Sequence, residues 1–118
     1  MAILVAALAI AAPFEVTLVA PTHTPKANAR WYYSVRAVDA KGRAVHGRIT
    51  VEIVDPFGGA HPVQFGTSTK NITNFRFGGR FRDFVEWPTE SRGFKLTLRV
   101  TIRSGGKVVR KTYWVKPR

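Results

Sequence analysis

Residues 94–103 read FKLTLRVTIR, and this stretch decides the fold class. Apolar side chains occupy every second position, and Lys, Thr or Arg fills the positions between them. A period of two puts successive side chains on opposite sides of an extended chain, so it predicts a strand with one face toward a core. The expected inner face holds Phe94, Leu96, Leu98, Val100 and Ile102, and the outer face holds Lys95, Thr97, Arg99, Thr101 and Arg103.

Similar alternation recurs on both sides of this stretch. We predict further strands over residues 14–19, 31–39, 48–54, 62–65, 71–77, 80–85 and 108–115. Turns are expected at Asp39–Gly42, Asp55–Gly59 and Ser104–Gly106, because Asp can cap its own backbone and Gly accepts a positive φ. No window of residues 13–118 shows a convincing helical period. Seven or eight short strands separated by turns predict an all-β antiparallel sandwich, with a closed barrel as the alternative.

The strongest three strands also predict the core. Their inward positions are Trp31, Tyr33, Val35, Ile49, Val51, Ile53, Leu96, Leu98, Val100 and Ile102. In this register an Asp at Val100 would bury an unpaired charge and destabilise the fold by several kcal/mol. An Asp at the outward Thr101 would cost little.

Composition limits the possible chemistry. The 118 residues suit one domain and include 19 Lys and Arg against 7 Asp and Glu, a net charge of +12. There is no Cys, which excludes disulfides, Cys-ligated zinc, iron–sulfur clusters and thiol nucleophiles.

The first twelve residues, MAILVAALAIAA, carry no charged side chain. A membrane-spanning helix needs about 20 apolar residues, so this segment is too short for one. Its length and small residues match the apolar core and cleavage site of a secretory signal peptide, although no Lys or Arg precedes Lys26. We therefore expect a signal-peptide-like segment over 1–12, a sandwich domain over 13–118, and a secreted or cell-surface protein. The alternative for 1–12 is a first strand or a short buried helix.

A hairpin near the N-terminal third carries a family resemblance. Residues 33–45 read YSVRAVDAKGRAV and are followed by HGRITVEI at 46–53. This stretch resembles the signature hairpin of bacterial immunoglobulin-like domains, in which a strand ends in Asp-x-x-Gly-x-x-Val. The wider chain, with APTHTP at 20–25 and WPTESRGF at 87–94, is similar to small secreted proteins of unassigned function in high-GC Gram-positive bacteria. The resemblance implies a single immunoglobulin-like sandwich and no particular site residues; Ala44 stands where such hairpins often have Pro.

The polar residues give little support for catalysis or metal binding. The chain has no nucleophile-elbow, P-loop or dinucleotide-binding motif. His23, His46 and His61 lie in separate segments. The acids Asp83, Glu86 and Glu90 are expected to pair with neighbouring Arg80, Arg82 and Arg92 rather than to act as acid and base. We predict a non-enzyme with no metal and no cofactor.

The C-terminal part is strongly basic. Residues 91–118 contain nine Lys or Arg and no acid. Lys95, Arg99 and Arg103 share one predicted face, and of Arg110 and Lys111 on the next strand only one can join them. These five cations are the candidate anion-binding residues, since such a field attracts nucleic acid, anionic lipid or cell-wall phosphate polymers. The alternative is that the charges only keep the protein soluble.

Aromatic residues suggest a second kind of contact. Trp31, Tyr32 and Tyr33 are consecutive, so at least one must point outward, and Tyr32 is the candidate exposed aromatic. Residues 76–82, RFGGRFR, resemble one copy of an Arg-Gly-Gly RNA-binding segment, although Phe77 and Phe81 share the parity of core positions.

We predict a secreted or cell-surface, non-catalytic immunoglobulin-like module that binds an anionic cell-wall polymer or a protein partner. One alternative is an intracellular nucleic-acid-binding domain. Another is a surface-filament subunit that donates residues 1–12 as a strand to its neighbour.

Overall fold

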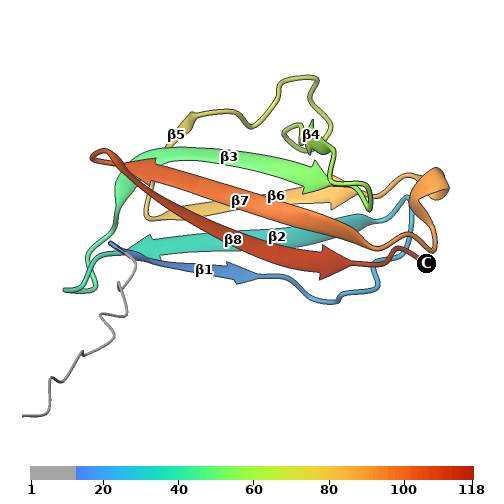
Figure 1. Cartoon of the computed structure of the whole chain (residues 1–118), viewed down its shortest axis with the longest axis horizontal. Coiled ribbons are helices and arrows are strands. Elements are labelled where there is room, and N and C mark those ends of the chain that lie inside the picture. Colours follow the sequence, from blue (N-terminus) through green and yellow to red (C-terminus); the bar gives the residue numbers. More distant parts are fainter. Residues whose placement is uncertain (1–12) are drawn as a thin grey trace, which may run out of the picture.

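Residues 13–118 form eight antiparallel strands (Figure 1). A computed structural model describes residues 13–118; the expected signal peptide lies outside the described residues. The strands are β1 Glu15–Val19, β2 Arg30–Val38, β3 His46–Val54, β4 Ala60–Pro62, β5 Phe75–Gly78, β6 Arg80–Glu86, β7 Leu96–Ser104 and β8 Lys107–Val115. A single 3-10 turn, η1 Thr89–Ser91, stands before β7.

The strands form two layers. Hydrogen bonds connect the strands in the order β1-β2-β6-β5-β3-β7-β8, with the short β4 beside β3. This continuous sheet folds over, so that β1, β2 and β6 form one layer and β5, β3, β7 and β8 form the other (Figure 1). The layers join where β5 turns sharply into β6 at Gly79, whose φ of 74° suits only glycine without strain. The predicted all-β class and sandwich architecture are therefore confirmed.

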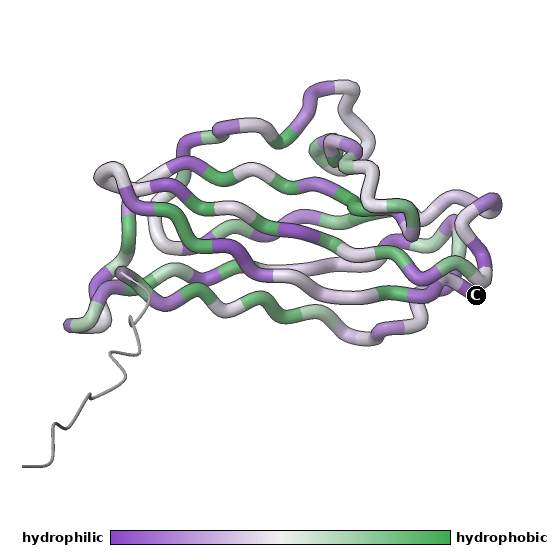
Figure 2. The backbone as a smooth tube through the Cα atoms, viewed as in Figure 1, coloured by the Kyte–Doolittle hydropathy of each residue, from purple (hydrophilic) through white to green (hydrophobic). Residues whose placement is uncertain are grey.

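The core lies between the layers and follows the predicted alternation, visible as the change of colour along the strands in Figure 2. Eight of the ten predicted core residues are buried, and Ile53 and Leu96 are partly buried against them. Loop residues Ile72 and Trp87 are also fully buried. Trp87 meets Trp31 edge to face at 5.5 Å between ring centroids, so one end of the core is aromatic.

Two expectations for the stretch 94–103 were wrong. Phe94 precedes β7 and is 53% exposed, because the chain is still in a turn closed by the Phe94 N–H donating to the Ser91 carbonyl at 3.1 Å. Thr101 is only 4% exposed although its position faces outward. It stands directly between Thr50 on β3 and Arg110 on β8, so neighbouring side chains on the sheet surface surround it.

The middle of the chain holds less strand than predicted. The expected strand over 62–65 is wrong, since β4 shares only Pro62 with it, and the expected strand over 71–77 is reduced to β5. Residues 63–74 instead run along the edge of β3. Val51 donates to the Ile72 carbonyl at 3.0 Å and accepts from the Val63 N–H at 3.0 Å. This loop thus completes the backbone hydrogen bonding of β3 without a regular strand.

The seam between the first and last strands is closed at one end. Segment 23–27 runs beside the chain end, where Lys116 N–H donates to the His23 carbonyl at 2.7 Å and Arg118 N–H to the Pro25 carbonyl at 3.0 Å.

Among residues 13–118, no helix has the length and apolar character to cross a bilayer.

Candidate anion-binding site

Three arginines stand side by side on the outer surface of the β5–β3–β7–β8 layer. Arg48 on β3 is directly opposite Arg76 on β5 and directly opposite Arg103 on β7. Directly opposed residues of antiparallel strands point to the same face, and adjacent strands are about 4.8 Å apart. All three side chains are exposed. We call Arg48, Arg76 and Arg103 the arginine row.

Further cations extend the row. Arg110 on β8 lies one register step away, opposite Thr101, and its side chain is exposed. A shallow depression beside the row is lined by His46, Gly47, Arg48, Arg76, Phe77 and Gly78. It is open because Gly78 lacks a side chain: a Cβ there would stand only 3.0 Å from Nδ1 of His46.

The arginine row has no counter-charge in the described part of the chain. No acidic oxygen of residues 13–118 comes within ion-pair distance of Arg48, Arg76, Arg103 or Arg110. Arg48 donates one hydrogen bond through Nη1, to the Asn74 carbonyl at 3.0 Å. Like charges placed directly opposite one another destabilise a sheet. The row is thus a local cost to folding that a bound anion would remove.

Arg99, a predicted site residue, has a different role. Its Nη2 donates to Oε1 of Glu52 at 3.1 Å, and both side chains are about two-thirds covered. Glu52 sits directly opposite on β3. Arg99 is therefore already neutralised inside the sheet.

The other four predicted cations do not all lie at the same site. Arg103 and Arg110 belong to the basic face, as expected. Lys111 stands opposite Val100 and so points to the other side of the layer, which corrects its inclusion in the site. Lys95 precedes β7, and its Nζ lies 5.4 Å from the centroid of the Trp114 ring. Sequence reasoning missed Arg48 and Arg76, because alternation shows that a residue points outward and not which strands become neighbours.

The acidic residues do not pair as expected. Glu86 meets Arg30, at 3.5 Å from Nε, and Asp83 accepts from the Gly66 N–H at 3.0 Å. The expected partners Arg80, Arg82 and Arg92 form no ion pair within residues 13–118. The cross-strand register decides this, since Arg30 is directly opposite Glu86.

The histidines stay apart. His23 stacks on both Tyr113 and Trp114, with ring centroids 4.0 Å away in each case. Nε2 of His61 forms a hydrogen bond with Oδ2 of Asp55 at 2.7 Å. This hydrogen bond and a second one from the Gly59 N–H lower the pKa of the Asp55 carboxyl. In the described part of the chain no three His, Cys, Asp or Glu residues gather into a metal-binding group.

The two aromatic predictions are settled by burial. Tyr32 is 43% exposed, as predicted, and lies on the outer surface of the opposite layer. The segment resembling an Arg-Gly-Gly repeat forms β5, the bend and the start of β6. Its Phe77 and Phe81 are buried in the core, so the core interpretation is the right one.

Comparison with known proteins gives a fold and nothing finer. No protein-family model matches the chain, and no curated protein matches it in sequence. A solved structure of a DUF4466 family protein from Parabacteroides merdae is similar, with a TM-score of 0.51 and 10% sequence identity. The similarity covers 88% of this chain and 45% of that protein, so this chain spans less than half of its length. At this identity the likeness concerns the fold alone.

Proposed function

We propose that this chain is a secreted or cell-surface, non-catalytic, immunoglobulin-like module that binds a linear phosphate-bearing polymer through the arginine row. The observation that carries the proposal is the placement of Arg48, Arg76 and Arg103 across three adjacent strands, with no acidic group of residues 13–118 within ion-pair distance. Guanidinium groups suit phosphate because their forked donors match two of its oxygens. A row of them suits a chain of phosphates better than a single ion.

Strand connectivity supports the immunoglobulin-like part of the proposal. β2 pairs with β6 in one layer, and in the other layer β7 lies between β3 and β8, which is the division of strands in that fold. The turn at 39–43 supports it as well. Asp39 Oδ1 accepts from the N–H groups of Lys41 and Arg43, each at 2.9 Å, and Val45 is buried behind it.

The deciding experiment is a titration with inorganic polyphosphate at two salt concentrations. Each phosphate contact releases counterions, so the parent should lose affinity steeply as salt rises. Changing Arg48, Arg76 and Arg103 to Gln should lower the affinity at least ten-fold and flatten the salt dependence.

A matched variant removes the same charge elsewhere. Lys26, Lys41 and Lys70 are exposed loop residues, and changing all three to Gln also removes three positive charges. This control should bind nearly as the parent does. Equal losses in the two variants would mean that net charge alone attracts the polymer, and an unchanged row variant would overturn the site. Tighter binding to a single-stranded oligonucleotide of equal charge would favour the nucleic-acid alternative.

Export and lack of catalysis need separate tests. A tagged full-length gene should yield protein in the medium or at the surface, trimmed near Ala12. Retention of Met1 in a cytoplasmic protein would contradict export. A hydrolase screen should detect no turnover, and activity abolished by Asp83→Asn or Glu86→Gln would contradict the non-catalytic assignment.

A further inference from the structure

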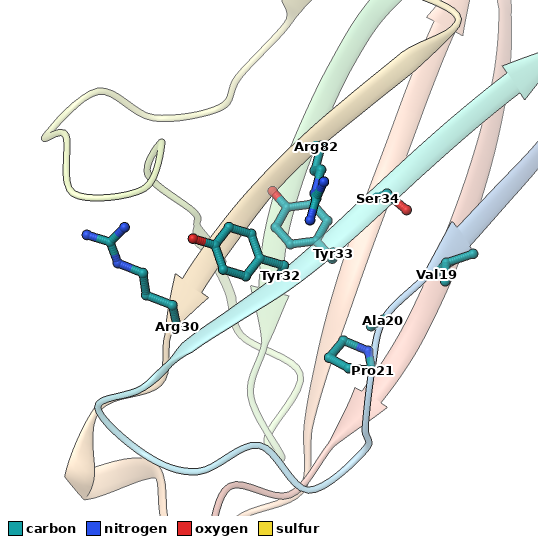
Figure 3. Close-up of a pocket in the computed structure, with 8 residues that line it drawn as sticks. All are labelled: Val19, Ala20, Pro21, Arg30, Tyr32, Tyr33, Ser34 and Arg82. Carbon is teal, nitrogen blue, oxygen red and sulfur yellow. The ribbon is translucent and has the colours of Figure 1, made fainter.

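A second hollow surface lies on the opposite layer, along β2. Two adjoining shallow pockets share Val19, Ser34 and Arg82 and together run between β1 and β6. Figure 3 shows the first pocket, where Ser34 on β2 lies between Arg82 and the Val19–Pro21 segment. The hollow follows from sequence, because the small Ser34 separates the larger Tyr32 and Arg36 on the same face. We call this surface the β2 groove.

The β2 groove presents one aromatic ring to solvent. Tyr32 stands directly opposite Phe84, with ring centroids 5.4 Å apart. The Arg30 guanidinium lies 4.4 Å from the centroid of Phe84 and covers that ring. The Arg82 guanidinium lies 5.4 Å from the Tyr32 centroid and leaves the residue 43% exposed. Tyr32 is therefore held between fixed neighbours with part of its ring open.

The groove is also cationic. Arg36 stands directly opposite Arg80, and Arg82 follows two residues later on the same face of β6. None of these three forms an ion pair within residues 13–118. Glu86, the acidic residue on this face of β6, forms an ion pair with Arg30. Like-charged side chains directly opposite one another again cost stability unless an anion joins them.

We propose that the β2 groove is a second binding site, for an acidic polysaccharide. The apolar C–H face of a sugar ring packs on the electron-rich face of an aromatic side chain, which Tyr32 supplies. Val19, 56% exposed, adds apolar surface beside it. Arg36, Arg80 and Arg82 supply forked donors for the carboxylate or sulfate groups of successive sugars.

Two other chain-like ligands fit less well. Single-stranded nucleic acid is held by stacking successive bases on successive aromatic rings, and here Phe84 is covered, which leaves Tyr32 alone. A peptide that binds by strand addition needs a free strand edge. The groove lies over β2, which β1 and β6 flank on its two sides, so β2 offers no free edge there. Neither objection applies to a sugar chain.

The test uses a short oligogalacturonate, with its methyl-esterified and therefore uncharged form as the matched probe. The acidic form should bind, and the neutral form should bind at least ten-fold more weakly. Tyr32→Ala should weaken binding about ten-fold, whereas Tyr32→Phe, which keeps the ring, should retain most of the affinity. The double change Arg36→Gln and Arg80→Gln should reduce affinity and flatten its salt dependence.

The control is the variant with all three residues of the arginine row changed to Gln. It should keep full oligogalacturonate affinity, so loss of the polyphosphate site and loss of the groove are distinguishable. Because Tyr32 is exposed, Tyr32→Ala should keep a parental melting temperature. Equal binding of the acidic and neutral probes, or no effect of Tyr32→Ala, would overturn the proposal. Tighter binding of oligothymidylate than of oligogalacturonate, lost in Tyr32→Ala, would assign the groove to nucleic acid instead.

Discussion

Arg99 and Glu52 form an ion pair between β7 and β3, with Nη2 3.1 Å from Oε1, on a sheet face that is otherwise cationic. The pair divides that face in two. On one side lie the arginine row and Arg110, and on the other lies Lys95 above the Trp114 ring. Arg99 therefore belongs to the stability of the sheet, while the unpaired cations remain available to a ligand.

This pair should be measurable by a double-mutant cycle. Arg99→Gln, Glu52→Gln and the double variant, compared by urea unfolding, should give a coupling free energy of about 0.5–1 kcal/mol, since both side chains keep some contact with water. Arg110→Gln, on the same face and unpaired, should change stability by less than about 0.5 kcal/mol. If the coupling free energy is zero and Arg99→Gln loses polymer binding while Glu52→Gln keeps it, Arg99 belongs to the binding site instead.

Thr101 tests whether low exposure or an outward position in the alternating pattern decides the cost of introducing a charge. Asp at Thr101 should lower the free energy of unfolding by about 1–3 kcal/mol, because the site is 4% exposed, and Asp at Val100 should cost more. Thr17→Asp, at an exposed position of β1, should stay within about 0.5 kcal/mol of the parent. Thermal or urea unfolding of the three variants decides. If Thr101→Asp matches Thr17→Asp, the outer surface is more open than the structure has it.

Alternation predicts the fold well because it depends on neighbours along the chain. The inner faces of β2, β3 and β7 follow from period two alone. Which strand lies beside which depends on contacts between distant residues, so the juxtaposition of Arg48 with Arg76 had no local signal. Ile72 and Trp87 enter the core from irregular segments that carry no period at all.

Gly47 sets how closely β3 approaches the end of β7. A Cβ at this position would collide with the backbone carbonyl oxygen of Arg103 and stand 3.1 Å from Cβ of Ser104. Gly47→Ala should destabilise the fold by about 1–3 kcal/mol, as overpacking does, and should displace Arg103 and weaken polyphosphate binding. Gly42→Ala is the comparison: its φ of 75° strains Ala, but space is open there and binding should not change. Urea unfolding and the polyphosphate titration measure both effects, and parental values for Gly47→Ala would contradict the close approach.

Tyr33 carries a hydroxyl that has no hydrogen-bond partner among residues 13–118. Its oxygen is buried without a hydrogen bond, and burial, with a smaller contribution from Asp83, raises the pKa of Tyr33 far above its ordinary value. The unfolded chain therefore releases this proton first, and stability should fall as pH rises above 10. Tyr33→Phe should raise stability by about 1 kcal/mol at neutral pH and lessen that alkaline loss. Unfolding from pH 7 to 11 checks both, and a destabilised Tyr33→Phe would reveal a partner for the hydroxyl.

The arginine row should itself weaken the fold. Arg48 is flanked by Arg76 and Arg103, so Arg48→Gln removes the middle of three opposed charges and should raise the melting temperature at low salt. The gain should shrink as salt screens the repulsion, with a Debye length of about 10 Å at 0.1 M. The same variant should bind polyphosphate less well. Charges that serve only solubility need not be placed opposite one another, so a stabilised variant that has lost binding would indicate a site maintained for its ligand. A variant that is stabilised, aggregates sooner and binds as the parent does would instead assign the row to solubility.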